Sequence, residues 1–168
     1  AAVGMHAAIL GGAMLGKSIV ILGGGTIGLM VLQACKSLGA TDITVVDVLN
    51  KRLELAKKLG ASRVINGKEE DTVALLRSEE LYGDHGVDLV FEAAGSVFTA
   101  QQAVQIVARG GKIMMVGTQS KPVPIDFLKI NREVTIQTSF RYCNNFPQTI
   151  EAIASGKFNV KDMVTHIY

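Results

Sequence analysis

The chain has 168 residues, of which 48% are apolar and 19% charged, and its formal net charge is +2. This length fits one domain whose core needs no disulfide or metal to fold. The composition excludes a disordered chain, and the small net charge gives no support to nucleic-acid binding. Cys35 and Cys143 lie far apart and outside any Cys-x-x-Cys pair. They argue against a structural zinc site and favour a reducing, cytoplasmic compartment.

The first segment is apolar but does not predict a membrane span. Residues 1–16 carry no charge, yet the run stops at Lys17, short of the ~20 residues that a bilayer requires. No basic segment leads it, so a signal peptide is not predicted either. We expect a buried helix from Val3 to Leu15, ended by Gly16. Because the first residue is Ala1 rather than Met, we also expect the chain to be a piece of a longer protein.

The rest of the chain alternates between short β-branched apolar runs and segments with a helical period. This alternation predicts parallel strands joined by right-handed helical crossovers. The fold class is therefore α/β, a doubly wound (Rossmann) parallel sheet of about six strands in a single domain. The predicted strands cover residues 18–22, 43–46, 64–65, 87–91, 112–116 and 134–140, and the predicted helices after the opening one cover 26–38, 51–59, 71–81, 98–108 and about 146–154.

The turn after the first predicted strand reads Gly-x-Gly-x-x-Gly, at Gly23, Gly25 and Gly28. In a glycine-rich chain this motif alone is weak evidence for a nucleotide site. Its place between a predicted strand and a predicted helix, however, gives each glycine a structural role. Gly23 turns the chain, Gly25 lets backbone approach a pyrophosphate, and Gly28 lets the helix pack on the strand. Helix amides then hold the phosphates without a basic side chain. We assign these glycines, with Thr26 and Ile27, to cofactor binding; the alternative is a tight turn without a ligand.

An acidic residue follows at the end of the second predicted strand. Asp47 lies about twenty residues beyond the last glycine of the motif. A carboxylate there can accept hydrogen bonds from both ribose hydroxyls of an adenosine and repels a 2′-phosphate, which predicts NAD rather than NADP. We assign Asp47, its neighbour Val48 and Arg52 to cofactor binding. Arg52 either lies over the adenosine or is a solvated charge on a lysine-rich helix.

Two later strand ends carry small residues. They are Ala93 and Ala94 after the fourth predicted strand, and Val116 and Gly117 after the fifth. Ligands of doubly wound sheets lie across the carboxyl ends of the strands, so these four residues are assigned to the floor of the cofactor site. The alternative is that any tight turn from strand to helix favours glycine and alanine.

The sequence predicts no catalytic and no metal-binding residue. Alcohol oxidation requires a general base or a Lewis-acid metal. His6, His85 and His166 are scattered, and neither Tyr82 nor Tyr142 has a lysine four positions later. Neither requirement is met by this chain alone.

These residues together resemble the coenzyme-binding domain of medium-chain zinc-dependent dehydrogenases. The resemblance covers nearly the whole chain: residues 3–7, the turn at 23–28, Asp47 with 52–61, and Phe-Glu-Ala-Ala-Gly at 91–95. Within that family, Phe-Arg-Tyr-Cys-Asn-Asn-Phe-Pro at 140–147 and Val-Thr-His at 164–166 are similar to polyol dehydrogenases of the sorbitol and xylitol type. Asn145 and Phe146 depart from the threonine and tryptophan common there, which leaves the substrate open.

The resemblance implies that residues 1–168 are the NAD-binding domain of an enzyme that oxidises a secondary alcohol of a polyol. Zinc ligands then belong to a separate catalytic domain that this chain lacks, and the chain alone binds NAD without turnover. The resemblance also implies that Ile27 packs on the nicotinamide, that Val116 and Phe140 fix its carboxamide through backbone groups, and that Arg141 faces the coenzyme. Threonine or butanediol dehydrogenases, and a non-catalytic nucleotide-sensing module, remain the alternatives.

The last predicted strand suggests a partner. Residues 134–140 carry few charges, and an uncovered edge strand of this kind is prone to pair with another chain. The resemblance implies pairing across a two-fold axis, which predicts a homodimer or homotetramer. No nucleic-acid or membrane partner is predicted.

Overall fold

A computed structural model of the protein describes residues 1–130 and 133–164. Its centre is a six-stranded sheet in the order β3-β2-β1-β4-β5-β6, with every neighbouring pair parallel. The strands are β1 Ser18–Leu22, β2 Asp42–Asp47, β3 Arg63–Asn66, β4 Val87–Glu92, β5 Val107–Met115 and β6 Thr135–Thr138. The helices are α1 Ala2–Gly11, α2 Thr26–Ser37, α3 Asn50–Lys58, α4 Thr72–Leu76, α5 Val97–Ile106, α6 Phe127–Ile130, α7 Phe146–Ala154 and the 3₁₀ helix η1 Lys161–Met163. The predicted doubly wound sheet is confirmed.

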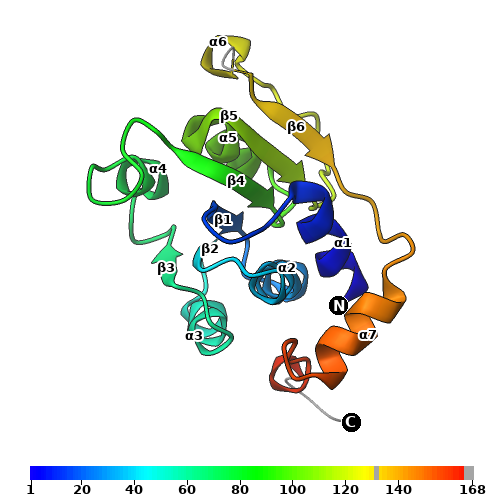
Figure 1. Ribbon diagram of the computed structural model, residues 1–168. Helices are drawn as coiled ribbons and strands as arrows, with labels where there is room; N and C mark the ends of the chain where they lie inside the picture. Colours follow the sequence, from blue (N-terminus) through cyan, green and yellow to red (C-terminus); the bar gives the residue numbers. More distant parts are fainter. Residues whose placement is uncertain (131–132, 165–168) are drawn as a thin grey trace.

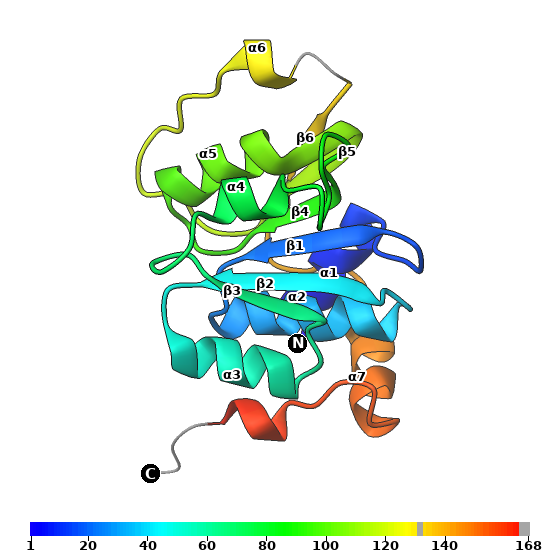
Figure 2. The ribbon, with the colours of Figure 1, turned by 90° about the vertical axis from the view of Figure 1, so that its left-hand side faces the viewer.

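Helices cover both faces of this sheet. Figure 2 shows α4 and α5 on one face and α1, α2 and α3 on the other, with α7 outside the second layer. The core accordingly has two parts: Ile19 and Ile21 of β1 pack toward α1 and α2, whereas Val20 and Leu22 pack toward the layer of α4 and α5. A strand buried on both faces explains why this run is continuously apolar rather than alternating.

The strand order brings distant segments to one edge. β1 lies between β2 and β4, and Leu22 at its end is in register with Val46 and Glu92. The order reverses between β1 and β4, and in such sheets a ligand lies outside the carboxyl ends of the strands at that reversal. The segments after β1, β2, β4 and β5 therefore meet at this edge (Figure 1).

The opening helix is shorter than predicted. It ends at Gly11, not Leu15, because Gly12 adopts the left-handed conformation (φ 75°) and its N–H bonds to the carbonyl oxygens of Ala8 and Ile9. Gly16, expected to end the helix, lies in a separate turn. The nearer glycine closes the helix first.

The predicted helix 71–81 is wrong in its second half. Asp71 does not belong to the helix but caps it, accepting hydrogen bonds from the amides of Val73 and Ala74. α4 ends at Leu76, and the carbonyl of Ser78 then accepts from both Leu81 and Gly83 in successive turns.

Two boundaries near the far edge also differ. The helix predicted to reach Ala108 ends at Ile106, and β5 begins directly at Val107, with a register shift against β4 between Val87 and Leu89. β6 is confined to Thr135–Thr138, shorter than the predicted 134–140. The short helices α6 and η1 were not predicted.

Within the described residues, no helix combines the length and apolar character needed to cross a membrane.

Candidate functional site

Two glycines of the turn after β1 are required by the packing of the protein itself. Gly23 has φ 111°, and a Cβ atom there would lie 2.8 Å from the amide nitrogen of Ala94. A Cβ atom on Gly28 would overlap the carbonyl oxygen of Gly23. The segment after β4 therefore excludes a side chain at Gly23, and the packing of α2 on the turn excludes one at Gly28.

Gly25 differs from both. Its backbone is extended (φ −72°, ψ −175°), which any residue can adopt, and an added Cβ atom would meet no protein atom within 4 Å. Gly25 is also the N-cap of α2, and no side chain caps this helix end. Nothing in the described protein requires glycine here, whereas a phosphate approaching the free amides of the helix would.

Asp47 is buried at the end of β2 and accepts four hydrogen bonds. Its Oδ2 atom accepts from the amide of Gly24 at 2.8 Å and from Nη1 of Arg52 at 3.3 Å. Its Oδ1 atom accepts from the amides of Val48 and Leu49 at 2.8 and 2.9 Å. The carboxylate thus joins the glycine-rich turn to the start of α3.

Arg52 lies near the start of α3, beside Asp47. The side chain is half-exposed, but its guanidinium pairs with the buried carboxylate of Asp47. The contact is the longest of the four at Asp47 and has one end in solvent, so it contributes little stability.

The small residues after β4 and β5 lie at the same edge of the sheet as the turn. The amide of Ala93 donates to the carbonyl of Leu22 at 2.8 Å, and the amides of Val116 and Gly117 both donate to the carbonyl of Glu92, at 2.9 and 2.8 Å. The structure therefore brings Ala93, Ala94, Val116 and Gly117 to the edge where the sequence placed them.

Glu92 was not among the predicted site residues. Its side chain is fully buried at the end of β4 and accepts hydrogen bonds from two backbone amides and two side chains after β4 and β5. The available signal was a charged residue directly after the apolar run 89–91, since buried carboxylates are rare unless they have partners.

Phe140 and Arg141 follow β6 at the same edge of the sheet. The amide of Ser139 donates to the carbonyl of Met115 at 2.9 Å, so the end of β6 remains tied to β5. Phe140 is 80% exposed, and the guanidinium carbon of Arg141 lies 5.3 Å from the centre of its ring, a cation–π contact. Arg141 has φ 55°, a conformation that L residues rarely adopt.

Thr165 and His166, part of the Val-Thr-His motif that resembles polyol dehydrogenases, lie outside the described residues.

Two titratable groups with raised pKa values lie away from this edge. Burial raises the pKa of the Cys35 thiol and of the Tyr82 hydroxyl.

Within residues 1–130 and 133–164, no group of three or more His, Cys, Asp or Glu side chains is arranged to hold a metal ion. The described residues therefore do not fit a catalytic zinc.

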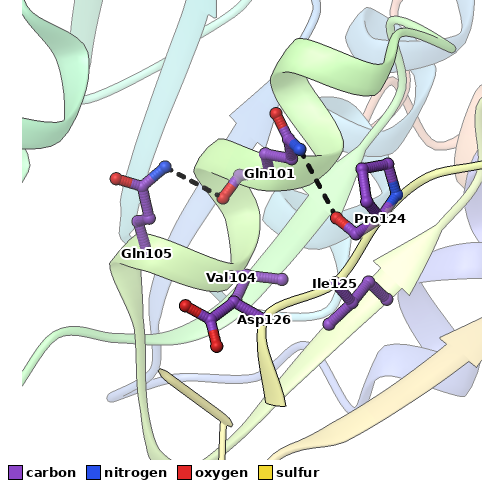
Figure 3. Close-up of a pocket in the computed structure, with 6 residues that line it drawn as sticks. All are labelled: Gln101, Val104, Gln105, Pro124, Ile125 and Asp126. Carbon is purple, nitrogen blue, oxygen red and sulfur yellow. Dashed lines mark hydrogen bonds between the residues drawn. The ribbon is translucent and has the colours of Figure 1, made fainter. Parts of the chain in front are cut away.

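A small cavity of about 230 Å³ lies elsewhere, between α5 and the segment before α6 (Figure 3). Its lining contains none of the predicted site residues. Gln101 donates through Nε2 to the carbonyl of Pro124, and Gln105 donates to the carbonyl of Gln101. The cavity is separate from the site.

A doubly wound sheet with a glycine-rich turn, an open helix end and a strand-end acid defines a dinucleotide-binding domain. Comparison with known families agrees: residues 26–155 match the zinc-binding dehydrogenases, and the chain belongs to that family.

Similar proteins share this domain over about half of their length. The chain is 64% identical to an uncharacterized zinc-type alcohol dehydrogenase-like protein, YdjJ, of Escherichia coli, covering 100% of the chain and 48% of that protein. It is 41% identical to sorbitol dehydrogenase of Bacillus subtilis, covering 99% and 47%. The chain thus spans about half the length of the curated relatives it matches.

Solved structures agree with the fold. A crystal structure of an E. coli oxidoreductase of unknown specificity superposes with a TM-score of 0.96 and 63% identity, covering 99% of this chain and 48% of that one. A zinc-binding dehydrogenase from Sinorhizobium meliloti bound to NADP superposes with a TM-score of 0.90 and 28% identity, covering 98% and 49%.

Proposed function

We propose that this chain is the coenzyme-binding domain of an oxidoreductase and binds NAD at the carboxyl edge of its sheet. The observation that carries the proposal is Gly25, because the packing of the protein explains Gly23 and Gly28 but gives no reason for a glycine between them. A pyrophosphate held by the amides at the start of α2 supplies that reason. The bound nicotinamide would supply the hydride acceptor, and the residues of this chain bind and orient it.

Asp47 supports NAD over NADP. Its buried negative charge lies beside the turn, where the adenosine ribose of a dinucleotide would come. All four of its acceptor positions are occupied by protein donors, and Arg52 is the longest and most exposed of them. We expect a ribose hydroxyl either to take the place of Arg52 at the Asp47 carboxylate or to bind between the two side chains. NADP is the competing candidate, since the S. meliloti relative holds it and a nearby arginine can accommodate a 2′-phosphate.

The remaining predicted residues have proposed roles on the nicotinamide side. Ile27 is partly exposed at the start of α2 and would pack against the nicotinamide ring. Backbone groups of Val116 and Phe140 would fix the carboxamide, with Ala93 and Ala94 beneath. Arg141 would face the coenzyme.

For the whole protein, we propose oxidation of a secondary alcohol of a polyol, in the cytoplasm. Similarity to sorbitol dehydrogenases supports the polyol, and the two free cysteines support a reducing compartment. The catalytic zinc would be held outside this chain, so the chain alone binds coenzyme without turnover. A butanediol dehydrogenase is the second candidate, because one superposes with a TM-score of 0.88 and 31% identity.

Titration of the chain with NADH, NADPH and ADP-ribose tests the proposal. We expect NADH to bind more tightly than NADPH, because of Asp47, and more tightly than ADP-ribose, because a nicotinamide subsite adds contacts. Failure of all three to bind would overturn the proposal. Equal affinity for NADH and ADP-ribose would favour the nucleotide-sensing module, and tighter NADPH binding would reverse the assigned preference.

A further inference from the structure

We propose that Glu92 is a positioning residue of the coenzyme site: its buried carboxylate ties the segment after β4 to the segment after β5. Glu92 touches neither the proposed pyrophosphate turn nor solvent, and acts through the residues that it holds. The inference rests on the proposed function, because it concerns the shape of the same site.

One oxygen of Glu92 organises the segment that follows β4. Its Oε1 atom accepts from the amides of Ala94 and Gly95 at 3.0 and 2.8 Å, and from the hydroxyl of Thr99 at 2.7 Å. These three donors come from residues 94 to 99, so the carboxylate folds the chain back on the end of its own strand and fixes the start of α5.

The other oxygen reaches the segment that follows β5. Oε2 accepts from Nε2 of Gln119 at 2.8 Å. A Cβ atom on Gly117 would lie 2.7 Å from this oxygen, so only glycine lets the two segments approach this closely. The backbone carbonyl of Glu92 also accepts from the amides of Val116 and Gly117. Glu92 therefore holds both segments at once.

The same contacts extend to the glycine-rich turn. Ala94, which Glu92 holds through its amide, is the residue that an added Cβ atom on Gly23 would strike. Ala94 therefore lies directly against Gly23, the first residue after β1. Glu92 thus connects the carboxyl ends of β1, β4 and β5 without contacting a ligand.

These contacts use both oxygens of the carboxylate. All four donors to its side chain are neutral, and each needs an acceptor. A methionine of similar length accepts hydrogen bonds only weakly and would leave these donors buried without good partners. Burying a carboxylate costs free energy. In return, its hydrogen bonds fix the segments after β4 and β5.

The location of Glu92 predicts which half of the coenzyme depends on it. β4 and β5 lie on one side of β1, and β2, which carries Asp47, lies on the other. The adenosine half is assigned to the β2 side, so the nicotinamide half lies over the segments that Glu92 holds. Loss of Glu92 should therefore weaken NADH binding more than ADP-ribose binding.

The test compares Glu92→Met with Glu80→Met, the same change at an exposed glutamate in the turns before β4, both in the 168-residue chain. We expect Glu92→Met to weaken NADH about tenfold and ADP-ribose less than about twofold. We also expect faster hydrogen exchange at the amides of Ala94 and Gly95. Glu80→Met should match the wild type in all three measurements. An equal loss for both ligands would overturn the inference, because a general loss of folding does not discriminate between them.

A second variant covers the case in which Glu92→Met does not fold. Gln119→Met removes the donor to Oε2 but keeps the size of the side chain, and we expect it to weaken NADH selectively by a few fold. Unchanged NADH affinity in Gln119→Met would then overturn the inference. If the wild-type chain binds no NADH, the proposed function fails, whereas the exchange rates of Ala94 and Gly95 still test whether Glu92 holds this segment.

Discussion

The backbone amide of Gly24 donates a 2.8 Å hydrogen bond to Oδ2 of Asp47. The acid at the end of β2 and the glycine-rich turn after β1 therefore form one unit, although 23 positions separate them. Asp47 has two tasks in consequence: it fixes the backbone of the turn, and it places a negative charge beside the proposed adenosine site.

Replacing this carboxylate should change coenzyme preference. We expect Asp47→Asn to weaken NADH about tenfold and to narrow the preference for NADH over NADPH, because an amide neither accepts both ribose hydroxyls nor repels a 2′-phosphate. Fluorescence titration with both coenzymes measures the two constants. Asp84→Asn, at an exposed aspartate, is the matched control and should leave both unchanged. Equal titration curves for wild type and Asp47→Asn would contradict the assignment of Asp47 to the adenosine ribose.

The two later glycines of the turn should respond oppositely to alanine. Gly28→Ala forces a Cβ atom onto the carbonyl oxygen of Gly23, so we expect a loss of a few kcal/mol in the free energy of unfolding. Gly25→Ala meets no protein atom and should unfold like the wild type, yet bind NADH at least about tenfold more weakly, because the methyl group displaces the pyrophosphate.

Urea unfolding and NADH titration of both variants separate these outcomes. Gly25→Ala with wild-type NADH affinity would remove the main support for the coenzyme site. Gly28→Ala with wild-type stability would show that α2 can move away from β1.

The glycine-rich turn and the sheet could be predicted because their signals are local. Short apolar strands, helical periods and a glycine motif each lie within a dozen residues of sequence, and parallel crossovers then fix the topology. Helix ends were less certain, since Gly12 and Gly16 both favour a stop and the sequence does not say which is used.

Glu92 illustrates what the sequence could not supply. Its partners include Gln119, which only the pairing of β4 with β5 brings near. No periodicity encodes a contact of this range. The same holds for Arg52, whose pairing with Asp47 depends on how α3 starts after β2.

At the opposite end of the sheet, Asp88 should make stability dependent on acid pH. Burial by itself would raise the pKa of Asp88, but hydrogen bonds from the amide and hydroxyl of Ser18, with the charges of Lys17 and His85, outweigh it and lower the pKa. A carboxyl with a lowered folded pKa stabilises the protein above its unfolded pKa of about 3.9 and loses that contribution as the pH falls through the folded value.

We therefore expect Asp88→Asn to lower the free energy of unfolding near pH 7 by on the order of 1 kcal/mol and to have a smaller effect below about pH 4. Urea denaturation across this range measures the difference, with Asp84→Asn as the control of equal charge change. A cost for Asp88→Asn that stays constant from pH 7 to the acid range would contradict the assigned pKa shift.

The free edge of β6 should let two chains pair. β6 ends the sheet (Figure 1), and Thr135, Ile136 and Thr138 are exposed. The amide of Ser139 donates to β5, and because amides alternate in direction along a strand, those of Ile136 and Thr138 point away from β5. These outward amides can pair with a second copy across a two-fold axis.

Thr138→Pro removes one outward amide but no hydrogen bond to β5. We expect wild-type chains to sediment as dimers or larger assemblies as concentration rises, and Thr138→Pro to remain monomeric while its circular dichroism stays that of the wild type. Thr138→Ala keeps the amide and should assemble like the wild type, which separates the backbone effect from loss of the side chain. A wild-type chain that stays strictly monomeric at high concentration, or a Thr138→Pro variant that assembles normally, would place any interface elsewhere than on β6.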